Sequence, residues 1–272
     1  MRRFASVAFH LLPIVGAVLT LIPLLWMIAA SFMAPGEANA VPPPFWPKDP
    51  SWGRYVALFT RLDMARHFLN SVIVTVGATV LSVLINGMAG YAFGKLRFRG
   101  RDRIFGALVT GLVVPAQIGM LPLFLLLREL GLVNTYAGVL IPYLASVFGI
   151  FLIRQYVLGV PDDLLDAARI DGAGEFRIFW TIVFPIIRPI LVTLATFSFL
   201  GAWNDFLWPL IILTDTSKQT LPVALANLAG EHVQDTELMM AGAVITILPA
   251  LLVFLAFQRT YVRGITAGGV KG

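Results

Sequence analysis

Six long apolar runs constrain the fold of this chain more than any other feature. They cover about residues 8–33, 68–93, 104–127, 137–157, 189–213 and 238–258. Each run is close to, or above, the roughly 20 residues that a helix needs to cross a hydrocarbon core of about 30 Å. Only helices and closed barrels satisfy their backbone groups in lipid, and the runs do not alternate as barrel strands would. The pattern predicts an all-α membrane protein with six transmembrane helices, forming one transmembrane domain over residues 1–272.

Composition agrees with this class and excludes several kinds of site. The chain has 272 residues, of which 58% are hydrophobic and 13% are charged, whereas a soluble domain carries about 25% charged residues. Cysteine is absent, which excludes disulfides and thiolate metal sites. The three histidines, His10, His67 and His232, lie in different segments, so we expect no metal site and no cofactor held by this chain. The net charge of +5 is explained by loops beside the apolar runs, and we expect lipid contact but no nucleic acid.

The distribution of Lys and Arg predicts the orientation in the membrane. One set of loops holds fourteen of the 20 basic residues: Arg2, Arg3, Lys95, Arg97, Arg99, Arg101, Arg103, Arg154, Arg169, Arg177, Arg188, Arg259, Arg263 and Lys271. The opposite set holds the other six: Lys48, Arg54, Arg61, Arg66, Arg128 and Lys218. Because positive loops stay inside, both termini should be cytoplasmic. The first run is too long for the core of a signal peptide, so we interpret it as an uncleaved span of a multi-pass inner-membrane protein.

A long polar segment, residues 158–188, separates the fourth and fifth runs on the predicted cytoplasmic side. Pro161, Asp162 and Asp163 are typical of a helix start, and Gly172 and Gly174 of a helix end. Leu164, Leu165, Ala168 and Ile170 give this helix an apolar side, and a second helix is expected over about 175–183. The residues alone allow two interpretations. The segment is either a capped helix pair lying on the bilayer or a docking surface for another protein; capping accounts for Asp162 and Asp163 but not for Asp166 and Asp171.

The order of residues in this segment resembles the EAA loop of permease subunits of ABC importers. The matching residues are Asp166-Ala167-Ala168, Asp171-Gly172-Ala173, Phe176, Ile182 and Pro185. Two further stretches, Gly201–Pro209 with Trp203-Asn204-Asp205 and the tail Tyr261–Gly272, resemble the carbohydrate-uptake branch, in particular the six-span subunit of the maltose-type permease pair. The chain departs from the motif at two positions: Asp166 replaces a Glu, and Phe184 replaces a Leu before the proline.

The resemblance implies a type I ABC importer permease fold with a cytoplasmic coupling helix. It implies that Asp166, Ala167, Ala168, Asp171, Gly172 and Ala173 dock an ATPase, with the shorter Asp166 side chain reaching a basic residue there. The tail after Gln258 is glycine-rich and basic, which by itself predicts a flexible end held near anionic lipid. The resemblance implies that this tail, residues 259–272, contacts the ATPase through Arg263, Gly264, Thr266 and Lys271. The implied partners are a second permease subunit, two ATPase subunits that bind ATP and Mg, an extracytoplasmic sugar-binding protein, and a carbohydrate. The permease itself would not be an enzyme.

Polar residues within the apolar runs are further candidates for function. Asp205 in the fifth run should face protein or water, because a charge near a helix centre costs about 2.5–3.5 kcal/mol. Trp203, Asn204 and Asp205 are therefore expected to line the pathway or brace a gate. Alternatively, Asp205 pairs with a neighbouring helix or reaches the outer surface, with the tryptophans as interfacial anchors. Asn86 and Gln117 are expected to form interhelical hydrogen bonds, and Gly87 and Gly90 to allow close packing.

Two other functions compete with the importer subunit. An ion-coupled secondary transporter would place ionisable residues near the midplane and show repeat symmetry, but only Asp205 qualifies and no repeat is apparent. A membrane-embedded enzyme would need paired carboxylates or a nucleophile with its base, and neither is apparent. The chain lacks a phosphate-binding P-loop motif, so an importer would need its ATPase on a separate chain.

Overall fold

The computed structural model describes residues 2–231 and 235–269, with side-chain environments over 11–228 and 235–258. Within these ranges the chain is helical and contains no strand. The α-helices are α1 Arg2–Ala30, α2 Gly53–Arg61, α3 Met64–Lys95, α4 Arg101–Thr110, α5 Ala116–Glu129, α6 Tyr136–Leu144, α7 Val147–Val157, α8 Asp162–Ile170, α9 Glu175–Ile178, α10 Phe184–Ile186, α11 Arg188–Asn204, α12 Leu207–Ile212, α13 Leu221–Glu231 and α14 Thr236–Gly269. A π-helix, Phe179–Val183, joins α9 to α10, and short 3-10 helices lie at Glu37–Asn39, Gly111–Val113 and Thr216–Lys218.

Three helical segments are long and apolar enough to cross a membrane alone: Leu11–Ala30, Met64–Lys95 and Thr236–Gln258. Three bent pairs bring the number of candidate spans to as many as six. They bend by 108° between Arg101–Val113 and Ala116–Glu129, by 41° between Tyr136–Leu144 and Val147–Val157, and by 84° between Glu175–Ile186 and Arg188–Asn204. Pro115 precedes α5 at the sharpest bend, where its ring prevents a continuous helix.

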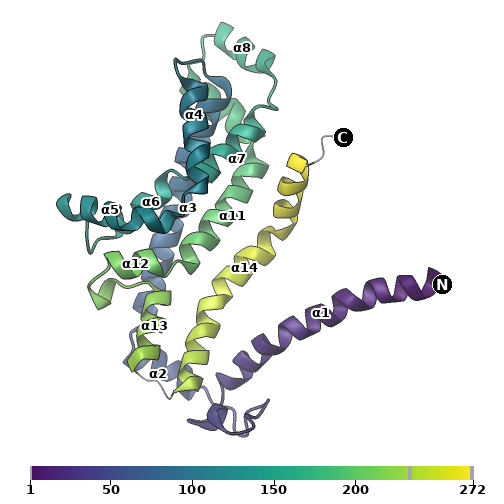
Figure 1. Ribbon diagram of the computed structural model, residues 1–272, viewed down its shortest axis with the longest axis vertical. Coiled ribbons are helices and arrows are strands. Elements are labelled where there is room, and N and C mark those ends of the chain that lie inside the picture. The colour runs from purple at the N-terminus through teal and green to yellow at the C-terminus, as the bar shows by residue number, and fades with distance from the viewer. Residues whose placement is uncertain (1, 232–234, 270–272) are drawn as a thin grey trace. The chain divides into compact units, whose positions relative to one another are not determined.

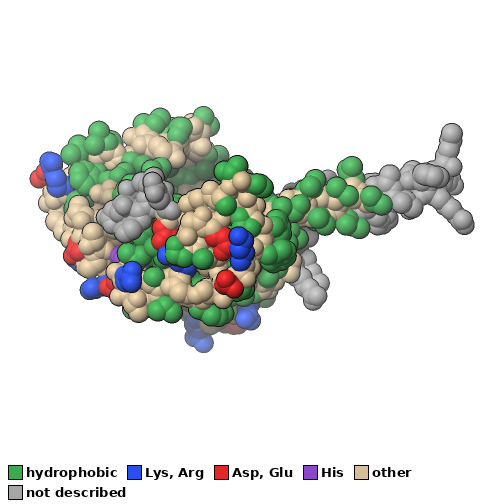
Figure 2. Space-filling view, turned by 90° about the horizontal axis from the view of Figure 1, so that it is seen from below, with side chains coloured by type: hydrophobic (Ala, Val, Ile, Leu, Met, Phe, Trp, Pro, Cys, Tyr) green, Lys and Arg blue, Asp and Glu red, His purple; other side chains and the backbone are tan. Residues whose placement is uncertain are grey.

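The chain divides into two compact units, and each is described by itself. Unit 1 comprises residues 1–66 and 221–249. In it, α13 packs tightly on α14, since a β-carbon on Gly242 would lie 2.5 Å from Leu225. The carboxylate of Glu237, at the start of α14, accepts a hydrogen bond of 2.8 Å from the backbone N–H of Ala38. The described part of α1 is covered with exposed hydrophobic side chains (Figure 2), as expected of a helix that meets lipid or protein.

Unit 2 comprises residues 67–220 and 250–272, and its core lies among α3, α7, α9, the π-helix and α11. The helices α3, α7 and α11 run alongside one another, with α8 at one end of the unit (Figure 1). Gly90 allows the closest approach of α3 to α7, because a β-carbon there would lie 2.6 Å from the side chain of Ile153. The predicted close packing at Gly87 and Gly90 is confirmed: Gly87 faces Phe179 and Leu191 at 3.5–3.6 Å.

The predicted interhelical role of Asn86 is confirmed, whereas that of Gln117 is wrong. Asn86 is fully buried, donates to Ser82 on its own helix, and accepts a 2.9 Å bond from the backbone N–H of Ser146 before α7. Gln117 is exposed on α5 and forms no hydrogen bond with the described residues. The sequence showed that both residues were polar within apolar runs, but it could not show which side of its helix each would occupy.

Two of the predicted segments differ from the structure. The run 189–213 is not one helix: α11 ends at Asn204, and the extended backbone of Asp205 separates it from α12. The tail after Gln258, whose glycines predict a flexible end, instead continues α14 as far as Gly269. Glycine lowers helix propensity by only about 1 kcal/mol, so scattered glycines do not end a helix that already has a long apolar part.

Candidate functional site

The start of α8 is fixed to the end of α3 by Lys95. Its ammonium group donates to the carbonyl of Val160 at 2.6 Å and to the carboxylate of Asp162 at 2.7 Å, while the side chain is only 6% exposed. The hydrogen bond from Lys95 lowers the pKa of Asp162, which keeps this carboxyl ionised at the helix N-terminus. The predicted helix start at Asp162 is confirmed, and Lys95 holds it in place rather than serving only as a topological charge.

The end of α8 requires a glycine at position 172. Gly172 has a φ of 84°, in the left-handed region that favours glycine. The N–H of Gly172 donates to the carbonyl of Arg169 at 3.0 Å, and the N–H of Ala173 to that of Ala168 at 2.9 Å. These two bonds form a Schellman motif, so the predicted end at Gly172 is confirmed. Gly174 has an extended conformation and precedes α9 instead.

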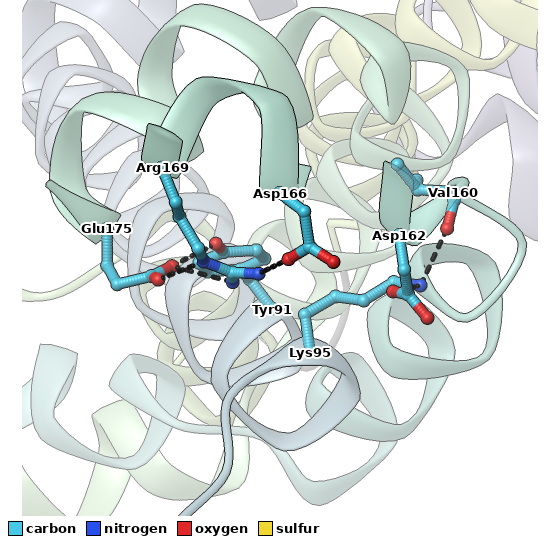
Figure 3. Close-up of polar contacts among 7 residues, drawn as sticks. All are labelled: Tyr91, Lys95, Val160, Asp162, Asp166, Arg169 and Glu175. Carbon is cyan, nitrogen blue, oxygen red and sulfur yellow. Dashed lines mark hydrogen bonds and ion pairs between the residues drawn. The ribbon is translucent and has the colours of Figure 1, made fainter. Parts of the chain in front are cut away.

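A network of charged side chains joins α8, α9 and α3 on the polar side of the loop (Figure 3). The guanidinium of Arg169 donates through Nε to Glu175 Oε1 at 2.7 Å and through Nη2 to Oε2 at 3.3 Å. Its Nη1 donates to Asp166 at 2.6 Å. The hydroxyl of Tyr91, on α3, donates to the same Glu175 carboxylate. The two carboxylates raise the pKa of Arg169 above its usual range, with Glu175 contributing most, so the guanidinium stays ionised at neutral pH.

The network and the buried side of α8 leave one face of the loop exposed. Leu165 is fully buried, and Ala168 and Ala173 pack against the same core. The outward face carries Leu164, 43% exposed, Ile170, 86% exposed, and Phe176, 70% exposed. The single apolar side predicted for α8 is therefore wrong, because Leu165 and Ala168 face the chain whereas Leu164 and Ile170 face away from it. Asp166, Ala167, Asp171 and Gly172 are exposed as well.

A second polar feature lies at the break between α11 and α12. The hydroxyl of Tyr143, on α6, donates to one carboxylate oxygen of Asp205, and the other oxygen accepts from the N–H of Trp208 at 3.4 Å. Asn204 is exposed and caps its own helix by donating to Leu200 at 2.8 Å. Trp203 is 1% exposed and stacks on Phe199 with ring centroids 5.9 Å apart. Trp203 and Trp208 are both buried, so the interpretation of these tryptophans as interfacial anchors is wrong.

Sequence reasoning missed four residues that position the loop: Tyr91, Lys95, Arg169 and Glu175. The sequence accounts for Lys95 and Arg169 only as topological charges and for Tyr91 only as part of an apolar run. A usable signal was the spacing of Asp166 and Arg169, which places opposite charges three residues apart on one helix. The proposed tail contacts Arg263, Gly264 and Thr266 lie in α14 with side chains outside the described part, and Lys271 lies outside the described residues.

Comparison with known proteins decides the family. The family described as binding-protein-dependent transport system inner membrane component matches residues 86–267, more than half of the chain. The chain belongs to this family. It is 39% identical to the arabinooligosaccharides transport system permease protein AraQ of Halalkalibacterium halodurans, over 94% of this chain and 93% of the relative. It is 35% identical to the diacetylchitobiose uptake system permease protein NgcG of Streptomyces coelicolor, over 98% of this chain and 89% of the relative.

A solved structure gives the same assignment. A chain from the crystal structure of a bacterial ABC transporter involved in the import of the acidic polysaccharide alginate superposes with a TM-score of 0.83 and 26% identity, covering 94% of the permease and 96% of that chain. The predicted fold class, an all-α type I importer permease, is confirmed. The family also supports an importer subunit over the ion-coupled secondary transporter. The permease is therefore a multi-pass component of the inner membrane.

Proposed function

We propose that this permease forms part of the sugar pathway of an ATP-driven importer and receives mechanical work from a separate ATPase through the docking loop, residues 162–185. The observation that carries the proposal is that the inner side of this loop is fixed to the rest of the chain, while its outer side is exposed. Its inner side is fixed to the chain by Lys95, by Glu175 and by buried Leu165, while Ile170 and Phe176 remain exposed on its outer side. Exposed large apolar side chains on a rigid polar loop are typical of a protein contact.

The fixed inner side allows a displacement of the docking loop to be transmitted to the spanning helices. Two ATPase subunits would close around ATP and Mg, and their movement would displace α8. Because α8 is tied to the end of α3 and its Leu165 is packed in the core of unit 2, the displacement would reach the spanning helices. Binding of nucleotide would then shift a two-state equilibrium of the pathway. The permease would hydrolyse no ATP itself, and both its termini would lie in the cytoplasm beside the ATPase.

The remaining docking contacts follow from the resemblance and from exposure. Asp166, Ala167, Asp171 and Gly172 are exposed around Ile170, and Ala168 and Ala173 shape the loop from within. Asp166 is already paired with Arg169, so a basic residue of the ATPase would have to compete with Arg169 or share the carboxylate. Arg263, Gly264, Thr266 and Lys271 of the tail would add a second contact with the ATPase.

The break at Asp205 is the best candidate for the wall of the sugar pathway. Backbone groups are left free where a helix is interrupted, and such breaks in membrane proteins lie against protein or a water-filled cavity. Asn204 would face the pathway, Asp205 would brace the break through Tyr143, and Trp203 would support it from behind. The second permease subunit would supply the opposite wall, and an extracytoplasmic binding protein would deliver the sugar.

The relatives suggest a di- or oligosaccharide as the transported class. Their names specify arabinooligosaccharides, diacetylchitobiose and, in a permease of Rhizobium radiobacter with 32% identity, lactose. Binding of a panel of mono-, di- and oligosaccharides to the associated external receptor would identify the sugar. Tight binding of monosaccharides alone would contradict the proposed class.

Docking is tested by co-purification with the ATPase. The double variant Ile170→Ser/Phe176→Ser removes the two most exposed apolar side chains of the loop, and we expect it to lower recovery of the ATPase about tenfold or more. Ile118→Ser is the matched control, since Ile118 is 67% exposed on α5, away from the loop. Full recovery with the double variant, or equal loss with the control, would contradict the docking assignment.

A further inference from the structure

The turn between α3 and α4 carries a second cluster of charge, beside the docking loop. Residues 95–103 include five basic side chains. Two are engaged: Lys95 holds α8, and Arg101 bonds to Asp102 and to the carbonyl of Leu96. The other three, Arg97, Arg99 and Arg103, are exposed and form no ion pair with any residue that the structure describes.

This turn is folded rather than extended. Gly100 has a φ of 84°, and Arg101 Nη1 reaches back to the carbonyl of Leu96 at 3.2 Å. Aromatic side chains pack against the turn. The ring centroid of Phe93 lies 5.7 Å from that of Phe98 and 5.7 Å from that of Phe105. The free arginines therefore extend from a fixed frame, which lowers the entropy that they would lose on binding a ligand.

The surroundings indicate the chemistry of the ligand. The arginines lie around a surface hollow of about 1000 Å³ lined by residues 97–103. Asp102 also lines it, but its carboxylate is paired with Arg101 at 3.0 Å and lies 4.0 Å from Arg154. Two large apolar side chains stand beside the arginines, Phe98 at 41% and Ile104 at 48% exposure. The turn also directly follows α3, an apolar helix of 32 residues that is long enough to span a membrane.

We propose that this hollow binds the headgroup of an anionic phospholipid. Guanidinium groups of Arg97, Arg99 and Arg103 match the phosphate diester in charge and geometry, and Phe98 and Ile104 contact the acyl chains. Free phosphate would gain nothing from the two apolar side chains. The site would make the cytoplasmic end of α3, next to the docking loop, sensitive to lipid composition.

The test uses the absence of cysteine, which allows one fluorophore to be placed at Ala107→Cys, an exposed position one turn beyond Arg103. The full-length chain is reconstituted in phosphatidylcholine vesicles, and quenching by brominated phosphatidylglycerol is compared with quenching by brominated phosphatidylcholine. We expect at least about fivefold preference for the anionic lipid, lost in Arg97→Gln/Arg99→Gln/Arg103→Gln. Each single variant should lower it about two- to fivefold, so the site remains testable if the triple variant fails to insert.

The control Arg61→Gln/Arg66→Gln/Arg128→Gln removes the same charge from other exposed positions and should keep the preference. Equal quenching by the two lipids would overturn the proposal, as would equal loss in the control. If millimolar inorganic phosphate abolishes the lipid preference, the hollow binds free phosphate instead. If the triple variant keeps its lipid preference but loses the ATPase on co-purification, the arginines contact protein rather than lipid.

Discussion

The guanidinium of Arg169 donates hydrogen bonds from two nitrogens to the carboxylate of Glu175, across the turn between α8 and α9. A third nitrogen of the same group holds Asp166, so a single side chain connects the exposed docking helix to the segment that re-enters the core. Tyr91 extends the connection to α3 through the same carboxylate (Figure 3). The geometry makes Arg169 a positioning residue for the docking loop.

Replacing Arg169 should therefore loosen the loop without unfolding the protein. Arg169→Gln removes the ion pair from Asp166 and leaves Glu175 with only the hydroxyl of Tyr91. The side chain of Arg169 is 35% exposed, so its loss should lower the free energy of unfolding by less than about 1 kcal/mol. We expect hydrogen exchange in α8 and α9 to rise severalfold and transport to fall. Arg169→Lys should be intermediate, because an ammonium cannot match the carboxylate with two nitrogens. Arg177→Gln, an exposed change nearby, is the control, and unchanged exchange in Arg169→Gln would refute the role.

The left-handed conformation of Gly172 predicts a sharp difference between two substitutions. Gly172→Val should disturb the end of α8 at a cost of roughly 1–2 kcal/mol, because a β-branched residue is strained at positive φ. Gly172→Asn should be tolerated, since asparagine adopts this conformation readily and no atom lies within 4 Å of the new β-carbon. Recovery of the ATPase with each variant measures the difference. Equal loss with both would mean that partner contact, not backbone conformation, explains the glycine.

The contact of α3 with α7 should not accept even one additional methyl group. In Gly90→Ala the β-carbon would meet Ile153 at 2.6 Å and the backbone nitrogen of Arg154 at 3.0 Å, so we expect a loss of about 1–3 kcal/mol in stability. Gly106→Ala on α4 has open space around it and should gain about 0.5–1 kcal/mol. Thermal unfolding in detergent compares the two. A melting temperature of Gly90→Ala equal to that of the original chain would show that the helices separate more easily than their packing implies.

The hydrogen bond from Tyr143 to Asp205 should stabilise the break between α11 and α12. Tyr143→Phe removes one donor from a partly buried carboxylate, which should cost about 1–3 kcal/mol and reduce transport. Tyr156→Phe is a suitable control, because the hydroxyl of Tyr156 forms no hydrogen bond with the described residues. Thermal unfolding and uptake of the labelled sugar measure both variants, and identical behaviour of the two would contradict a bracing role.

The fold was predictable from the sequence to the extent that it depends on apolar length and capping. The apolar runs, the start of α8 at Asp162 and the left-handed Gly172 follow from local chemistry, and they agree with the structure. The bends did not follow, because hydropathy is the same in a straight and a bent helix, and the break at Asp205 lies inside a continuous apolar run. The network around Arg169 also depends on tertiary contact: Tyr91 lies 84 residues before Glu175.

The central claim, that the docking loop faces the cytoplasm and binds the ATPase there, is tested most directly by labelling Ile170→Cys. The chain has no other cysteine, and position 170 is 86% exposed, so a membrane-impermeant maleimide reports on this site alone. The account predicts labelling in inside-out vesicles, protection when the ATPase is bound, and no labelling in right-side-out vesicles. Labelling from the outer side, or labelling that the bound ATPase does not slow, would contradict it.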